Sequence, residues 1–240
     1  MSAAVGKTSL AERLAGVRQR IEAAARRSGR AVSSVRLVAV SKFRTVEEIE
    51  EAIAAGVTEI GESRVQEAET KRGRIAAPHL VWHLVGRLQS NKAKKAVQYF
   101  DIIHSIGTLD MARRVDRLAG EQHKTQDVLI QVQVADEESK QGLAVSELYQ
   151  NLERMAELTQ LRVLGLMALP PYLPNPEDVR PYFARLRELR DGARSRGLGG
   201  PAFSELSMGM SHDFEVAVEE GATFVRVGTA IFGERPATGV

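Results

Sequence analysis

Short apolar runs alternate with amphipathic segments along almost the whole chain of 240 residues. Between the runs, apolar residues recur every three or four positions, which is the period of a helix with one buried face. Strict alternation of buried strands with helices predicts a parallel sheet. The runs with the length and β-branched content of buried strands are 35–41, 57–60, 80–85, 102–106, 128–134, 163–169, 203–207 and 224–227.

Capping signals place the starts of several helices. Apolar positions from Leu10 to Ile21 predict a helix before the first strand, and Ser9 with Glu12 has the spacing of a capping box. Thr45 with Glu48 predicts a second capped helix after the first strand. Further N-caps are expected at Ser63, Thr108, Asn175 and Ser211.

Eight strand–helix units in a chain of this length predict an α/β fold, a closed (β/α)8 TIM barrel with an additional N-terminal helix. The rival is an open doubly wound sheet, which often carries a glycine-rich phosphate turn after its first strand. That turn is absent from the sequence after 35–41. No linker or low-complexity segment divides the chain, so we expect one domain over residues 1–240.

Composition removes several classes of function. The sequence has no cysteine, which excludes disulfides, thiolate metal sites and a cysteine nucleophile and fits a cytoplasmic location. The net charge is only +2, and the basic segments 92–95 and 180–196 have acidic neighbours, so we expect solvated faces and no nucleic-acid partner. No apolar stretch approaches the roughly 18–20 residues of a membrane span. The five histidines lack metal-ligand spacing, so no metal site is expected.

The residue at the end of the first predicted strand is Lys42. Active sites of TIM barrels lie at the carboxyl ends of the strands. Alternation puts Val38, Val40 and Lys42 on one face of the strand. Two interpretations stay open: a lysine that reaches solvent or pairs with a carboxylate, or a lysine whose pKa is lowered by desolvation and which forms a Schiff base.

The last two strands run into loops of small residues. Met208, Gly209 and Ser211 follow the seventh strand, and Gly228 and Thr229 follow the eighth. In TIM barrels these two loops often bind a phosphate, and Ser211 and Thr229 would add hydroxyl donors. The alternative is that the glycines form ordinary turns and that Ser211 is an ordinary N-cap.

Two of the polar residues in the predicted strands are candidates for the site. Arg226 is either paired with a carboxylate near another strand end, such as Glu59, Glu62 or Glu205, or directed at a ligand. His83, next to Trp82 in the third strand, is either a core histidine with a hydrogen-bond partner or part of the pocket lining. An amine and a phosphate site across one barrel mouth suit two ligands: a phosphosugar, as in lysine-dependent aldolases, or pyridoxal 5′-phosphate (PLP).

Five segments together resemble the pyridoxal phosphate homeostasis protein family. The resemblance covers nearly the whole chain and implies the fold of the N-terminal barrel of alanine racemase. The segments are VAVSK at 38–42, GESRVQE at 61–67, WHLVGRLQSNK at 82–92, LSMGMSHD at 206–213 and VRVGTAIFG at 225–233.

The resemblance also implies roles for individual residues. Lys42 would hold PLP as an internal aldimine, Ser211, Gly228 and Thr229 would hold its phosphate, and Arg226 would face the pyridine nitrogen. The remaining cofactor-binding candidates in these segments are Met208, Gly209 and His83. The positions that depart from the commoner family pattern are Ser63, Arg87 and Gln133.

A guanidinium beside the pyridine nitrogen keeps that nitrogen unprotonated, which weakens the ring as an electron sink. A racemase also needs a second acid–base group, which in alanine racemase comes from a second domain and the partner subunit. We therefore expect a monomeric PLP-binding protein of intracellular PLP homeostasis, with little or no amino-acid turnover, which supplies PLP to apo-enzymes. The alternative is a racemase-like PLP-dependent enzyme.

Overall fold

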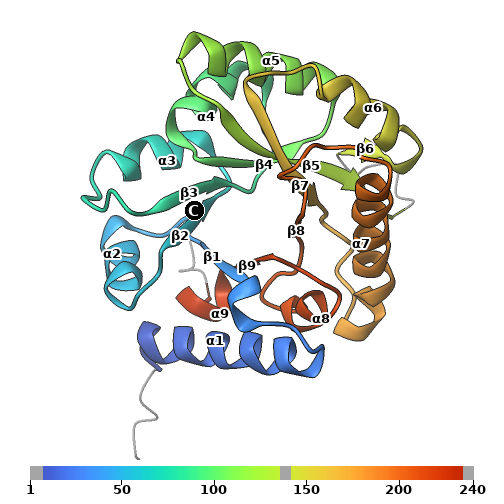
Figure 1. Cartoon of the computed structure of the whole chain (residues 1–240). Coiled ribbons are helices and arrows are strands. Elements are labelled where there is room, and N and C mark those ends of the chain that lie inside the picture. Colours follow the sequence, from blue (N-terminus) through green and yellow to red (C-terminus); the bar gives the residue numbers. More distant parts are fainter. Residues whose placement is uncertain (1–7, 136–141, 235–240) are drawn as a thin grey trace, which may run out of the picture.

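The computed structural model describes residues 8–135 and 142–234. Its strands form a closed, parallel, eight-stranded ring in the order β1-β2-β3-β4-β5-β7-β8-β9, and pairing of β9 with β1 completes it (Figure 1). The predicted (β/α)8 barrel is confirmed. The strands of the ring are β1 (Arg36–Val40), β2 (Glu59–Glu62), β3 (Val81–Leu84), β4 (Ile102–Ile106), β5 (Gln126–Gln133), β7 (Leu161–Met167), β8 (Glu205–Ser207) and β9 (Phe224–Val227).

Helices surround the ring, and α1 packs against α8 and α9 outside the β1–β9 side of the barrel (Figure 1). This is the additional N-terminal helix that the sequence predicts. A two-residue strand that was not predicted, β6 (Leu143–Ala144), pairs with β5 outside the ring. The helices are α1 (Leu10–Arg27), α2 (Val46–Ala54), α3 (Val65–Arg72), α4 (Ala93–Tyr99), α5 (Leu109–Glu121), α6 (Leu148–Met155), α7 (Arg180–Ser195), α8 (Phe214–Glu219) and α9 (Thr229–Phe232).

The helix caps are partly as predicted. Both capping boxes form, at Ser9 before α1 and at Thr45 before α2. The Thr108 side chain accepts a hydrogen bond from the third residue of α5. Asn175 caps a short 3₁₀ turn that precedes α7. The predictions for Ser63 and Ser211 are wrong, because α3 and α8 begin one and two residues later and have no side-chain cap.

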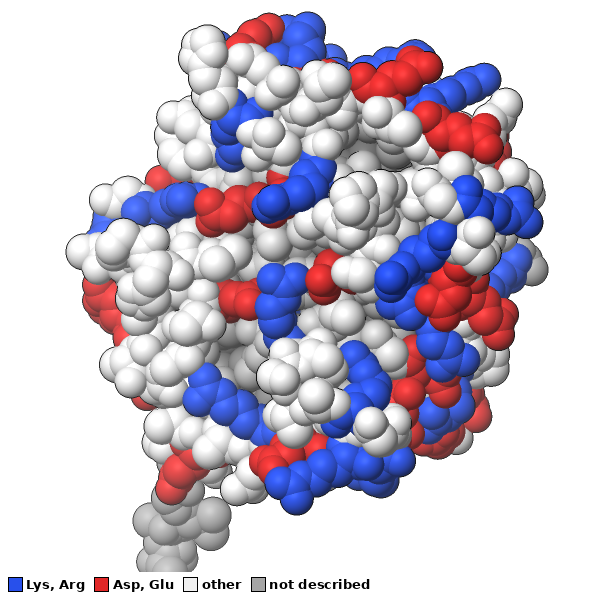
Figure 2. Space-filling model, in the orientation of Figure 1, with Lys and Arg blue, Asp and Glu red and all other residues white. Residues whose placement is uncertain are grey.

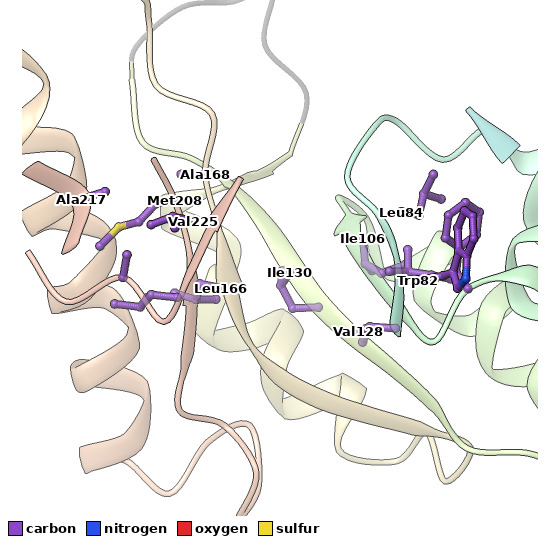
Figure 3. Close-up of a cluster of buried hydrophobic side chains, with 14 of the residues drawn as sticks. Trp82, Leu84, Ile106, Val128, Ile130, Leu166, Ala168, Met208, Ala217 and Val225 are labelled. Carbon is purple, nitrogen blue, oxygen red and sulfur yellow. The ribbon is translucent and has the colours of Figure 1, made fainter. Parts of the chain in front are cut away.

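Alternation along the strands produces two apolar cores. On β5, Val128 and Ile130 face outward into the layer between barrel and helices, whereas Leu129 faces into the barrel. Figure 3 shows part of the outer layer, where Trp82 of β3 and Leu166 of β7 lie among such side chains. The cluster inside the barrel consists of Val38, Val85, Ile102, Leu129, Leu164, Met167 and Phe224.

The surface carries interleaved charges. On the face shown in Figure 2, Lys and Arg side chains alternate with Asp and Glu side chains. In the basic segment of α7, Arg180 contacts Glu177, Glu219 and Glu220 at 2.8, 2.7 and 2.9 Å. Arg180 is therefore paired with acidic neighbours, as the sequence predicts for this segment. Across residues 8–135 and 142–234, no helix is both long enough and apolar enough to span a bilayer.

Candidate functional site

Lys42 lies in the turn that directly follows β1, at the carboxyl end of the barrel, and it is half-buried. Val38 and Val40 precede it and belong to the interior of the barrel. Gly61 on β2 makes room for them, because a Cβ there would lie 2.9 Å from Val38 Cγ1 and 3.3 Å from Val40 Cγ2. The strand end thus places the lysine where barrel active sites are found.

A buried polar cluster holds the turn that carries Lys42. The ammonium of Lys71, on α3, donates to the Ser41 carbonyl at 2.9 Å and to Glu62 Oε1 at 2.6 Å. The Ser41 hydroxyl donates to the same Glu62 oxygen at 2.6 Å. Glu67, also on α3 and 3.3 Å from the Lys71 ammonium, accepts from the Phe43 amide at 2.9 Å. Phe43 adopts a φ of 62°, which is rare for a bulky residue. Side chains of α3 and β2 therefore fix the turn.

This cluster was missed by the sequence interpretation. Glu62 was considered only as a partner for Arg226, and its buried carboxylate is paired instead with Lys71. Burial raises the pKa of Glu62, an effect that the Lys71 charge opposes. The available signal was spacing, because Lys71 falls on the buried side of α3 with Val65 and Ala68, three residues apart in each step.

The loops after β8 and β9 are joined by one side chain. Ser211 Oγ accepts hydrogen bonds from the Gly228 amide at 3.1 Å and the Ala230 amide at 3.3 Å. The Ser211 hydroxyl therefore bridges to the other loop, which explains why it does not cap α8. The Arg226 amide also donates to the Gly209 carbonyl at 3.0 Å. The two loops that the sequence proposed as a phosphate site thus lie together.

Two glycines shape this pair of loops. Gly209 has a φ of 89°, and a Cβ there would lie 2.5 Å from Ala217 Cβ and 2.9 Å from Phe214 Cα. A Cβ on Gly228 would lie 3.3 Å from the Val40 carbonyl oxygen, which places this loop beside the end of β1. Met208 is fully buried, whereas Thr229, the first residue of α9, is exposed.

Arg226 of β9 is buried and faces the interior of the barrel. Its guanidinium donates to Ser207 Oγ at 2.6 Å and to the Ala168 carbonyl at 2.9 Å. Burial lowers its pKa to about 10, so the group stays charged at neutral pH. It forms no ion pair with any carboxylate in the part of the chain that the structure describes, so the carboxylate-partner interpretation is wrong. The three carboxylates considered for it pair elsewhere: Glu59 with His83, Glu62 with Lys71 and Glu205 with Arg36.

His83 is fully buried inside the barrel. Its Nδ1 lies 2.9 Å from Nε2 of His104, which the sequence interpretation did not single out, and its Nε2 lies 3.0 Å from Glu59 Oε2. This is the arrangement of a core histidine with polar partners. Burial holds the pKa of His104 well below its usual range, so His104 is neutral.

The departures from the family pattern gather on the opposite side of the same barrel mouth. Ser63 and Arg87 line a pocket of about 550 Å³ after β2 and β3. Arg87 and Gln133 line a second pocket of about 510 Å³ next to it. Within residues 8–135 and 142–234, no three His, Asp or Glu side chains are grouped so that they could hold a metal ion.

The site as built offers one amine, a loop pair of small residues and a buried guanidinium, on the adjoining strands β1, β8 and β9. Comparisons with known proteins identify the family of the chain. A family model described as alanine racemase, N-terminal domain, matches residues 13–236. A relative from Aquifex aeolicus, named pyridoxal phosphate homeostasis protein, is 46% identical over 224 residues, which are 93% of this chain and 97% of that protein. The chain belongs to the pyridoxal phosphate homeostasis protein family.

Other members of the pyridoxal phosphate homeostasis protein family agree in extent and in fold. The relative of that name from Escherichia coli is 40% identical over 229 residues, 94% of this chain and 97% of that protein. PipY of Synechococcus elongatus, solved with PLP bound, is 40% identical, with a TM-score of 0.81 over 94% of this chain and 100% of that chain. The resemblance stated from the sequence is thereby confirmed.

Proposed function

We propose that this protein binds PLP at the carboxyl end of its barrel and holds it for supply to other proteins. The observation that carries the proposal is the placement of Lys42, the Gly228 loop and Arg226 on neighbouring strand ends, where β1 and β9 pair from Arg36 with Phe224 to Ala39 with Val227. Family membership supports it, since the relative PipY has been solved with PLP bound.

The chain's own groups fit the two ends of PLP. Lys42 would attach the aldehyde carbon covalently through its amine. The Ser211 hydroxyl has both oxygen lone pairs directed at the amides of Gly228 and Ala230, so its proton is left to donate to a phosphate oxygen. Thr229 would supply a second hydroxyl, and Gly228 lets this loop lie against the end of β1, where a Cβ would come within 3.3 Å of the Val40 carbonyl oxygen.

Of the remaining candidates, Arg226 would support the ring of PLP. Arg226 donates two hydrogen bonds to the protein, and a guanidinium has five N–H groups, so donors remain for the pyridine nitrogen. Gly209 would form the wall beneath the phosphate, whereas the Met208 side chain packs in the apolar layer between barrel and helices (Figure 3). His83 lies deeper, behind His104.

Bound PLP supplies an electron sink for carbanions at the α-carbon of amino acids. A charged guanidinium at the pyridine nitrogen opposes protonation there and weakens that sink. We therefore infer that the protein stores and supplies PLP with little or no amino-acid turnover. We further infer that it works as a monomer in the cytoplasm and that its partners are PLP-dependent apo-enzymes.

The covalent attachment is tested by loading the protein with PLP, reducing it with borohydride and mapping the modified peptide. We expect yellow protein, loss of the colour on reduction, and a phosphopyridoxyl group on Lys42. Lys42→Ala should abolish that adduct, whereas Lys94→Ala, an exposed lysine of α4, should leave it unchanged. An adduct that persists in Lys42→Ala, or one that is formed equally by a phosphosugar aldehyde, would contradict the proposal.

The supply role is tested with the loaded protein and a PLP-dependent apo-enzyme. We expect reactivation of the apo-enzyme while a scavenger removes free PLP, and we expect light scattering to give the mass of one chain. A screen for racemase, transaminase and decarboxylase activity should show no robust turnover. Robust turnover in any of them would favour the racemase-like alternative.

A further inference from the structure

A continuous line of polar side chains crosses the inside of the barrel from Arg226 to Glu59. Arg226 Nη1 lies 2.6 Å from Ser207 Oγ, which lies 2.8 Å from His104 Nδ1. His104 Nε2 lies 2.9 Å from His83 Nδ1, and His83 Nε2 lies 3.0 Å from Glu59 Oε2. These residues come from five strands of the ring, β9, β8, β4, β3 and β2.

The interior around this line is apolar. The ring of Phe224 packs edge-on against both imidazoles, with centroids 5.6 Å from His83 and 5.3 Å from His104. Ser207, His83 and His104 are all fully buried. Burying a polar group in such surroundings is costly unless it is hydrogen-bonded, so the side chains of this line must hydrogen-bond to one another.

When each imidazole carries one proton, the chemistry of the end groups gives every hydrogen bond a single direction. Arginine has only donors, so Ser207 accepts from Arg226 and is free to donate its own proton to His104 Nδ1. Neutral His104 then carries its proton on Nε2 and donates to His83 Nδ1. His83 in turn carries its proton on Nε2, which faces the carboxylate of Glu59.

The opposite direction fails at the last contact. If His104 donated to Ser207, a singly protonated His83 would have to donate through Nδ1, and its bare Nε2 would face the carboxylate of Glu59 at 3.0 Å. Two acceptors would then oppose each other in a buried site. The His83–Glu59 contact is poorly aligned for a hydrogen bond, but neither atom has another hydrogen-bond partner among the described residues. A proton between them is therefore required.

The far end of the line lies at the amino end of the barrel. Glu59 is the first residue of β2, and its side chain is 13% exposed. With Arg36 and Thr58 it lines a pocket of about 380 Å³. The side chain therefore lies at the edge of the barrel interior, and it supplies the acceptor on which the chain of donors ends.

We propose that Ser207, His104 and His83 are positioning residues that hold the guanidinium of Arg226 in one orientation, through a one-way chain of hydrogen bonds ending on Glu59. These hydrogen bonds take the place of the carboxylate that would otherwise anchor a buried arginine, so the guanidinium is oriented without being neutralised. The role of this guanidinium toward the pyridine ring rests on the proposed function, whereas the chain of hydrogen bonds does not.

The first experiment needs no cofactor. Long-range ¹H–¹⁵N NMR spectra of the PLP-free protein report which nitrogen of each histidine carries the proton. We expect both His104 and His83 to carry a proton on Nε2 and none on Nδ1. Protonation of either ring on Nδ1, alone or together with Nε2, would overturn the proposed direction. In Glu59→Leu the final acceptor is gone, and the signals of His104, two links away, should shift.

The second experiment uses the PLP-loaded protein and a matched pair of variants. His104→Leu removes the acceptor for Ser207, whereas His104→Asn keeps an amide oxygen near the position of Nδ1. We expect His104→Leu and Ser207→Ala to shift the absorption band of bound PLP and to raise its Kd about tenfold, the effect of a weakened hydrogen bond to a charged group. His104→Asn should recover most of both effects.

Arg226→Leu separates the two hypotheses. If Arg226→Leu changes the spectrum and the affinity but Ser207→Ala and His104→Leu do not, the positioning role is wrong. If Arg226→Leu itself changes neither the spectrum nor the affinity, the proposed cofactor role of Arg226 is wrong. The histidine signals of the PLP-free protein still test the direction of the hydrogen bonds. Those signals come from the unmodified protein, so they test the direction of the hydrogen bonds even if a core variant does not fold.

Discussion

The ammonium of Lys71 donates a hydrogen bond of 2.9 Å to the backbone carbonyl of Ser41, the residue before Lys42. One lysine of α3 therefore holds the turn that presents another lysine to the barrel mouth. The same ammonium lies 2.6 Å from the buried carboxylate of Glu62, so removing it would affect both the turn and the charge balance beneath it.

Lys71→Met should destabilise the protein by about 3–5 kcal/mol, because it leaves the carboxylate of Glu62 buried without its partner. The measurement is the free energy of unfolding in urea. The double variant Lys71→Met, Glu62→Gln should recover part of the loss, because the uncompensated charge is gone. Lys95→Met, which breaks an exposed pair with Glu69, is the control and should change little. Equal losses in the two lysine variants would contradict this account.

Gly209→Ala should destabilise the protein by about 2 kcal/mol or more, since the φ of 89° is unfavourable for alanine and the new Cβ would overlap the start of α8. Gly16→Ala is the matched control, because Gly16 lies inside α1 and a Cβ there would meet nothing within 4 Å. That substitution should stabilise the helix by up to about 1 kcal/mol. Thermal unfolding of both variants decides the matter, and a stable Gly209→Ala protein would refute the strain argument.

Periodicity and capping predicted most of the fold. Buried strands and helices with one apolar face carry local signals, so the order of elements, the barrel and the boxes at Ser9 and Thr45 could be read from the sequence. Ser211 was misread for a physical reason. A serine before a helix looks like a cap, and nothing local shows that its oxygen bonds to the amides of Gly228 and Ala230, 17 and 19 residues away.

Long-range pairing also explains what was missed at the site. His104 lies in an apolar strand, and only closure of the barrel brings it between His83 and Ser207. The partner of Arg226 was sought among carboxylates, because charge is visible in a sequence. The actual partners are a hydroxyl and a backbone carbonyl, and any strand end can supply those.

Ser211→Ala should loosen the loop pair and raise the Kd for PLP, because the amides of Gly228 and Ala230 lose their acceptor and the phosphate loses a hydroxyl donor. We expect a change of about tenfold, measured by equilibrium dialysis. Ser195→Ala, at the far end of α7, is the control and should bind PLP like the unmodified protein. Unchanged affinity in Ser211→Ala would place the phosphate elsewhere.

The stability of the protein should fall below about pH 6.5 with a contribution from His104. Burial holds the pKa of His104 well below its usual range in the folded state, whereas the unfolded chain takes up a proton near the ordinary value of about 6.5. The unfolded state then binds more protons, so the free energy of unfolding decreases as the pH falls, by up to about 1.4 kcal/mol per pH unit. Above about pH 6.5 this contribution is fully present.

His104→Asn tests this contribution, because it removes the titrating ring and keeps an acceptor for Ser207. We expect the difference in free energy of unfolding between the two proteins to be constant above about pH 6.5 and to change steadily in favour of the variant between about pH 6.5 and pH 5. Urea unfolding at half-unit pH steps measures it. Parallel curves down to pH 5 would mean that His104 takes up a proton in the folded barrel. The neutral, Nε2-protonated ring that joins Ser207 to His83 would then be lost.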